Sequence, residues 1–271
     1  MKNRFMLAPL TNQQSHVDGT LSDEEFRWLT MRAQGGFGLT MTCASHVQAI
    51  GQGFAGQLGC FGDQHLEGLT RLATAINKED SLSFVQLHHA GRRSPKDLIG
   101  GQPVSSGVDE KMDSRAMTTG EVEDMVEAFI IAAIRSEKAG YHGVELHGAH
   151  DYVLCQFLNA ELNVRTDKYG GSLENRSRVL FDIIDGIRAR CGADRCGRRV
   201  LRGCRLGGWR LHAAGWRNAW CCHATLPRRR LQPRGTRVVP LGKTGRGGGQ
   251  WHRGRRRRGA SAHWRFRPRC R

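Results

Sequence analysis

Acidic residues are missing from one long part of this 271-residue chain. All 25 Asp and Glu residues lie at or before Asp194, whereas residues 195–271 have none. The first part has 19 Lys and Arg against those 25 acids, a net charge of −6, and the second part has 23 Lys and Arg, a net charge of +23. The overall charge of +17 is therefore the average of two unlike segments and does not by itself identify a nucleic-acid-binding protein. We predict an acidic globular part in 1–194 and a basic tail in 195–271.

Zinc-type cysteine pairs and long hydrophobic runs are also missing. None of the nine cysteines belongs to a C-x-x-C pair, and their odd number and scattered spacing exclude a fully paired disulfide framework. No apolar run reaches membrane-spanning length, and the apolar stretch near Met1 is too short for a signal peptide. These absences predict a protein of the reducing cytoplasm with no membrane partner.

Short apolar runs alternate with helical patterns along residues 1–194. Strands are predicted at 5–9, 39–44, 81–87 and 143–147, and helices at 23–33, 63–78, 118–139, 152–158 and 173–190. Ser22 with Glu25, and Thr118 with Glu121, have the spacing of capping boxes, and Asp63 is a candidate N-cap. Residues 88–117 are predicted to form a long polar loop.

Four strand-then-helix units in succession predict an α/β fold with a parallel sheet. Long loops after the strands favour a TIM (β/α)8-barrel, because barrel enzymes build their sites from such loops. Only about the first four βα units of a barrel are recognisable. A doubly wound sheet is the alternative, but Pro9-Leu10-Thr11 stands where that fold has its G-x-G-x-x-G turn after the first strand.

Two histidines three residues apart end the fourth predicted strand. His147 is placed at the strand end, His150 on the following loop, and Tyr152 two residues later. Two neutral imidazoles could offer N–H groups to an oxygen that gains negative charge in a reaction, and Tyr152 could supply a proton. The spacing also allows a pair of metal ligands or two unrelated loop histidines.

Several motifs occur in a fixed order at the ends of the predicted strands. They are Lys-Asn-Arg at 2–4, Ala-Pro-Leu-Thr at 8–11, Val-Gln-Leu-His-His-Ala-Gly-Arg at 85–92, His-Gly-Ala-His-Asp-Tyr at 147–152 and Arg-Thr-Asp-Lys-Tyr-Gly-Gly-Ser-Leu-Glu-Asn-Arg at 165–176. In this order and at these separations they resemble the Old Yellow Enzyme family of FMN-dependent oxidoreductases. The resemblance spans residues 2 to about 194.

The resemblance implies a TIM barrel that binds FMN over the carboxyl ends of its strands. NADH or NADPH would reduce the flavin, which would pass the hydride to an activated alkene such as an α,β-unsaturated carbonyl compound. The residues implied to contact the isoalloxazine are Ala8, Pro9, Leu10, Thr11, Ala44 and Gln86. Thr11 could also be a strand-end hydroxyl that satisfies backbone groups, and Gln86 in an apolar strand must find a polar partner whatever its role.

The same resemblance implies roles for the residues of the histidine stretch. His147 and His150 would bind the substrate carbonyl oxygen, and Tyr152 would protonate the α-carbon. His88, His89 and Arg92 are expected to shape their loop. We predict structural roles in ion pairs and helix caps for Arg165, Asp167, Tyr169, Asn175 and Arg176, and inert buried thiols for Cys43, Cys60 and Cys155.

The resemblance stops near Asp194. The tail has 22 arginines, one lysine, five of the six tryptophans and no sustained hydrophobic period. We interpret it as a disordered Arg/Gly/Trp-rich segment, produced by a reading-frame shift near Asp194, which translation of the neighbouring frames would test. The alternative is a non-catalytic barrel remnant whose tail binds nucleic acid by phosphate contacts and stacking. A half barrel exposes sheet edges, so poor solubility, self-association and weak FMN binding are expected.

Overall fold

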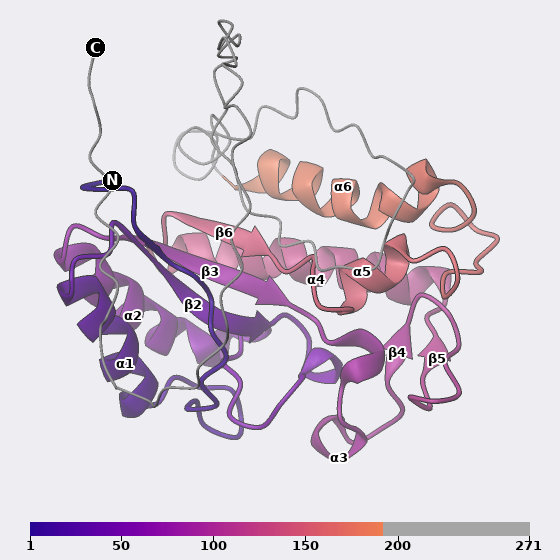
Figure 1. Cartoon of the computed structure of the whole chain (residues 1–271), viewed down its shortest axis with the longest axis horizontal. Helices are drawn as coiled ribbons and strands as arrows, with labels where there is room; N and C mark the ends of the chain where they lie inside the picture. The colour runs from indigo at the N-terminus through magenta and orange to yellow at the C-terminus, as the bar shows by residue number, and fades with distance from the viewer. Residues whose placement is uncertain (192–271) are drawn as a thin grey trace, which may run out of the picture. The chain divides into compact units, whose positions relative to one another are not determined.

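Four parallel strands, hydrogen-bonded in chain order, form the sheet on which the described chain is built (Figure 1). The computed structural model describes residues 1–191, so the predicted basic tail and its boundary at 194 lie outside the described residues. The strands are β1 (Met6–Leu7), β2 (Leu39–His46), β3 (Leu82–His88) and β6 (Gly143–Leu146). Each pairs in parallel with its neighbour in the chain, which confirms the predicted parallel sheet.

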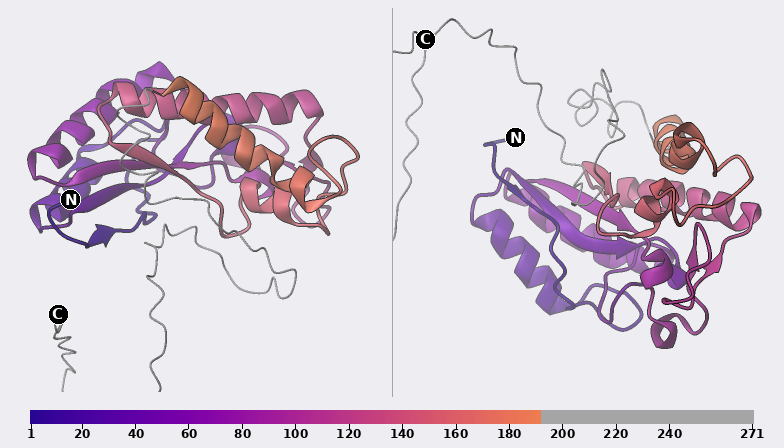
Figure 2. Two further views of the ribbon diagram at one scale, coloured as in Figure 1. Left: turned by 90° about the horizontal axis from the view of Figure 1, so that it is seen from above. Right: turned by 45° about the vertical axis from the view of Figure 1, so that its right-hand side comes forward.

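Helices connect the strands and lie as a layer on one side of the sheet (Figure 2). The longer ones are α1 (Asp23–Gln34), α2 (Leu66–Lys78), α4 (Thr119–Lys138) and α6 (Leu173–Arg190). The short elements are η1 (Ala49–Gly51), η2 (Asp63–His65), η3 (Gly91–Arg93), α3 (Lys96–Ile99), α5 (Val153–Leu158) and a separate pair of strands, β4 (Val104–Ser105) and β5 (Arg115–Ala116). Within residues 1–191, no helix combines the length and the apolar character needed to cross a membrane.

Alternation of side chains along β3 separates two apolar clusters. Val85 and Leu87 pack with Phe129 of α4 in the main core, between the sheet and the helices. Phe84 instead joins Met41 of β2 in a smaller cluster. Because successive side chains of a strand point to opposite faces, the smaller cluster lies on the sheet face away from the helices. That face is the interior side of a barrel.

The order of the strands decides between the two predicted folds. A doubly wound sheet reverses its strand order at a switch point, where it binds its ligand. Here the order β1-β2-β3-β6 follows the chain without reversal, and the helices cover one face. The described chain therefore forms the first four βα units of a TIM barrel, as the loop pattern predicted.

Two helix starts differ in their capping. Thr118 and Glu121 form the predicted box, since each side chain accepts a hydrogen bond from the other residue's backbone N–H. Ser22 accepts from the Glu25 N–H at 3.1 Å, but the Glu25 carboxylate turns inward and accepts from Cys43 at 2.9 Å. Only half of that predicted box forms, because the Glu25 carboxylate accepts hydrogen bonds from the buried Ser15 hydroxyl and the Cys43 thiol instead.

Three predicted elements have different bounds in the structure. Asp63 is the first residue of η2, not the N-cap that we predicted, so the chain makes a 3-10 turn before α2 begins. The segment 88–117, predicted as an irregular loop, contains η3, α3, β4 and β5. The first strand is limited to Met6–Leu7 rather than 5–9, because it lies at the edge of the described sheet and pairs with β2 through two residues.

Candidate active site

The register between β3 and β6 brings polar side chains together at the carboxyl end of the sheet. Gln86 lies opposite Glu145, and the Gln86 side-chain amide donates to the Glu145 carboxylate at 2.7 Å. His88 and His147 follow two residues later on their chains and therefore share that face. The His147 N–H donates to the Leu87 carbonyl at 3.0 Å, which extends the β-ladder to the first candidate catalytic residue.

The three residues predicted to be catalytic form one cluster. The ring centroids of His147 and His150 are 5.3 Å apart, and the Tyr152 ring lies 4.9 Å from His147 and 6.4 Å from His150. His147 and Tyr152 are half-buried and His150 is exposed. The strand end and the following turn thus direct two imidazoles and a phenol toward one region, as the spacing predicted.

His88 also belongs to this cluster, which sequence reasoning missed. Its ring lies 4.3 Å from the Tyr152 ring and 5.3 Å from the His147 ring, and it is fully buried. The Gln57 amide lies 2.9 Å from the His88 Nδ1, while the His88 Nε2 has no partner among the described residues. Its position two residues after Gln86 indicates that His88 shares the face of Gln86. Only the strand register, however, places His88 beside His147.

Burial keeps His147 and His88 neutral. Desolvation, followed by the neighbouring His150, lowers the pKa of His147 to about 4. Burial and the nearby His147 hold the pKa of His88 well below its usual range. The Ala149 N–H lies 3.4 Å from the His147 Nδ1, which makes that nitrogen the acceptor and leaves the ring proton on Nε2. A neutral His147 thus presents an N–H donor.

The residues predicted to contact flavin lie at the carboxyl ends of the first three strands. Ala44 of β2 is directly opposite Gln86 of β3, and both are buried. Residues 8–11 follow β1 immediately, and Leu10 in this segment is 59 % exposed. Ala8 and Thr11 are also exposed, and Pro9 is half-buried. An apolar, accessible segment and a carboxamide therefore occupy the same end of the sheet as the histidine cluster.

The residues expected to be structural do form a braced loop. Arg165 and Asp167 make an ion pair with an N···O distance of 2.5 Å, and hydrogen bonds led by that from Arg165 lower the pKa of Asp167. The Tyr169 N–H donates to Asp167 at 3.0 Å, the Arg176 Nε donates to the Leu158 carbonyl at 3.1 Å, and the Asn175 N–H donates to Ser172 at 3.3 Å. These contacts fix the start of α6.

The cysteines of the described chain differ in burial. Cys43 and Cys60 are buried, and burial raises the pKa of Cys60 to about 11, so neither is a reactive thiolate. Cys155 is only half-buried, in contrast to the prediction, because it sits on the turn-facing side of α5 and donates to the Gly148 carbonyl at 3.0 Å. Residues 1–191 contain no group of three or more His, Cys, Asp or Glu arranged to hold a metal ion.

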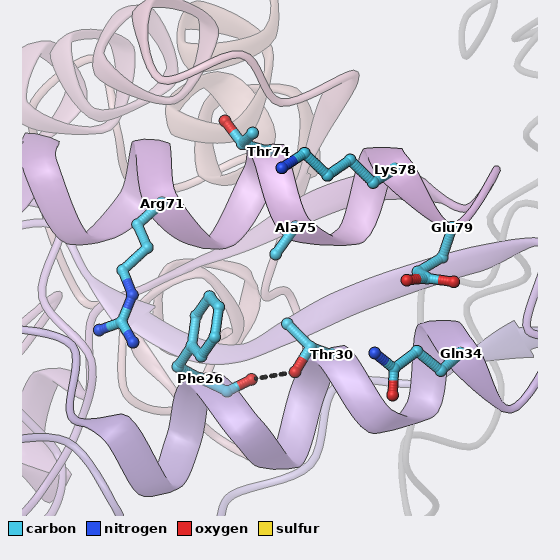
Figure 3. Close-up of a pocket in the computed structure, with 8 residues that line it drawn as sticks. All are labelled: Phe26, Thr30, Gln34, Arg71, Thr74, Ala75, Lys78 and Glu79. Carbon is cyan, nitrogen blue, oxygen red and sulfur yellow. Dashed lines mark hydrogen bonds between the residues drawn. The ribbon is translucent and has the colours of Figure 1, made fainter.

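Two surface depressions differ in their relation to the cluster. One lies between α1 and α2 and is lined by Phe26, Thr30, Gln34, Arg71, Thr74, Ala75, Lys78 and Glu79 (Figure 3). These helices lie on the outer layer, so this groove is separate from the strand ends that carry the histidines. The other is lined by Arg92, Arg93, Asp151 and residues 108–112, and it adjoins the turn that carries His150.

Comparison with known proteins identifies a set of relatives. Residues 1–202 match the model of the NADH:flavin oxidoreductase / NADH oxidase family. The chain is 36 % identical over 192 residues to the probable NADH-dependent flavin oxidoreductase YqiG of Bacillus subtilis, covering 69 % of this chain and 51 % of that protein. It is 38 % identical over 189 residues to the NADPH dehydrogenase of Bacillus pumilus, covering 69 % of this chain and 56 % of that protein.

Solved structures agree with these matches. The old yellow enzyme homologue from Zymomonas mobilis has a TM-score of 0.66 at 29 % identity, covering 72 % of this chain and 58 % of that chain. A 2-naphthoyl-CoA reductase has a TM-score of 0.69 at 35 % identity, covering 72 % of this chain and 32 % of that chain. The chain spans about half the length of the curated relatives that it matches.

Proposed function

Since this chain belongs to the NADH:flavin oxidoreductase / NADH oxidase family, we propose that it forms the flavin- and alkene-binding side of an FMN-dependent ene-reductase. FMN is the cofactor of this family, and NADH or NADPH is its reductant. The proposal is carried by one observation: His147, His150 and Tyr152 converge at the carboxyl end of β6, on the sheet face that also presents Gln86.

The residues present fit the isoalloxazine part of FMN. A flavin ring needs a flat apolar seat and a few directed hydrogen bonds. Exposed Leu10 and its neighbours in 8–11 offer the apolar surface. The bond to Glu145 fixes the orientation of the Gln86 amide, whose oxygen would accept from a ring N–H. The motif resemblance ends near Asp194, and no residue of 1–191 is assigned to the FMN phosphate.

The histidine cluster suits an alkene conjugated to a carbonyl group. FMN, when bound, supplies the hydride that adds to the β-carbon. The Nε2–H of neutral His147 would donate to the carbonyl oxygen, with His150 as second donor, and would stabilise the enolate-like charge that develops there. The Tyr152 hydroxyl, beside both rings, would deliver the proton to the α-carbon. His147 and His150 would thus stabilise the negative charge on the carbonyl oxygen, which develops only as the hydride is added.

Separate measurement of the two half-reactions tests this assignment. In excess FMN, His150→Ala should slow the reoxidation of reduced flavin by cyclohex-2-enone about 100- to 1000-fold, because one oxyanion donor is lost. Flavin reduction by NADPH should change little. His16→Ala removes an exposed histidine far along the chain from the cluster and serves as the control.

Two outcomes would contradict the proposal. Equal slowing of both half-reactions in His150→Ala would contradict the assignment of His150 to the substrate carbonyl oxygen. A wild-type chain that binds FMN and accepts electrons from NADPH, but does not reduce the enone, would contradict the alkene as substrate.

A further inference from the structure

The turn that carries His150 has a backbone conformation that most residues avoid. His150 and Asp151 both have φ of 58°, in the left-handed region, and they are adjacent. Residues other than glycine rarely adopt this backbone conformation, and they keep it only where surrounding contacts hold them. The turn lies between His147 and Tyr152, so its geometry sets where the candidate proton donor and the second imidazole lie.

An arginine from the loop after β3 holds this turn from outside. The Arg92 Nε and Nη2 atoms lie 3.1 and 2.5 Å from one carboxylate oxygen of Asp151, and Arg92 also pairs with Asp109. The next residue, Arg93, donates to the His150 carbonyl at 2.7 Å, and its guanidinium lies 5.2 Å from the Tyr152 ring centroid. Two consecutive arginines therefore contact the three residues of the turn.

A buried glutamine ties the same two segments together. The Gln156 amide nitrogen donates to the Asp151 carbonyl at 2.7 Å and to the Ala90 carbonyl at 3.2 Å. Its oxygen accepts from the Arg92 N–H at 3.2 Å and from the Ser105 hydroxyl at 2.9 Å. Gln156 is fully buried, so these contacts satisfy an amide that would otherwise be costly to bury. These hydrogen bonds hold the backbones of residues 90–92 and of Asp151 close together, where the Arg92–Asp151 ion pair joins them.

We propose that Arg92 is a positioning residue that acts through Asp151 to fix His150 and Tyr152 over the alkene. This rests on the proposed function, which assigns those two residues to the substrate. The guanidinium holds the Asp151 carboxylate from two donor positions, which a lysine ammonium cannot reproduce. Without that contact the backbone of His150 and Asp151 can relax toward ordinary conformations. The His150 imidazole and the Tyr152 phenol then no longer point to the same region.

Three variants remove the Arg92–Asp151 contact in different ways. Asp151→Asn removes the charge, Arg92→Lys removes the planar fork, and Asp151→Gly removes the side chain while easing the left-handed conformation. With cyclohex-2-enone and excess FMN, each should raise KM for the enone or lower the enone half-reaction rate about tenfold. Flavin reduction by NADPH should change less than twofold. Asp167→Asn breaks the Arg165 ion pair at the α6 start and is the matched control.

The ring signals of labelled histidine in the ligand-free chain test the same inference without activity. Asp151→Asn should shift the His150 signal and leave that of His65 unchanged, whereas Asp167→Asn should shift neither. An unchanged His150 signal in Asp151→Asn overturns the positioning role, whatever the enzyme assay shows. A shifted His150 signal in a chain that reduces no enone supports the positioning of the turn and contradicts only the proposed reaction.

Discussion

His46 and His65 show what burial does to single side chains in this fold. Both are 2 % exposed, and burial lowers the pKa of each to about 4. The Phe61 ring lies against both imidazoles, at 4.9 Å from His46 and 4.6 Å from His65. The unfolded chain would take up a proton on each near pH 6.5, whereas the folded chain does not until about pH 4.

This difference predicts acid sensitivity of the fold. Because the unfolded state binds more protons in this window, the free energy of unfolding should fall as pH decreases from about 7 to about 5, at up to about 1.4 kcal/mol per pH unit for each histidine. Urea denaturation across this range measures it. His65→Leu should reduce the slope and His16→Ala should not, and a stability independent of pH in this range would contradict the prediction.

At the scale of elements, the start of α4 depends on a complete capping box. The Thr118 hydroxyl accepts from the Glu121 N–H at 3.2 Å, and the Glu121 carboxylate accepts from the Thr118 N–H at 2.8 Å. The hydrogen bond from Arg115 is the largest cause that lowers the pKa of Glu121 to about 2. This contribution to stability is present above the ordinary pKa of 4.5 and is lost as pH falls toward about 2.

We expect Thr118→Ala to lower the free energy of unfolding by about 1 kcal/mol at neutral pH, because the Glu121 N–H loses its capping acceptor. Urea denaturation with a fixed m-value measures the change. Thr70→Ala is the control, since the Thr70 hydroxyl is exposed and donates to the Leu66 carbonyl of its own helix. An equal loss of unfolding free energy in both variants would show that the Thr118 cap stabilises the fold no more than an ordinary helical threonine does.

At the scale of the whole molecule, the described units would supply only one side of the proposed flavin site. Residues 8–11, Ala44 and Gln86 can face the ring, but no residue of 1–191 is assigned to the phosphate, and the motif resemblance ends near Asp194. A phosphate group normally contributes strongly to cofactor affinity through backbone N–H groups and cations. The affinity of the given chain for FMN therefore depends on what residues beyond 191 supply.

We expect the chain to bind FMN weakly and to lose it during gel filtration. A titration of flavin fluorescence, with riboflavin as the comparison, measures the effect: the two should bind with similar affinity, because the ring is the part that the described residues can hold. Stoichiometric FMN retained through gel filtration, with a clear preference over riboflavin, would show that the chain contains a phosphate site and would argue against a shifted reading frame in 195–271.

The sequence by itself determined the succession of βα units, most helix bounds and the identity of the paired histidines. These depend on local patterns: hydrophobic periodicity, caps and short motifs. Helix α6 begins and ends as predicted, at Leu173 and Arg190, because Ser172 caps it and its apolar spacing is regular. The resemblance of several motifs to one family predicted the family and its cofactor.

Only the tertiary structure decided which side chains meet. His88 lies 59 residues before His147, and no local pattern states that the register of β3 and β6 places the two rings 5.3 Å apart. The inward turn of Glu25 and the pairing of Arg92 with Asp151 have the same origin. Contacts between distant segments depend on strand register and burial, which short-range sequence patterns do not encode.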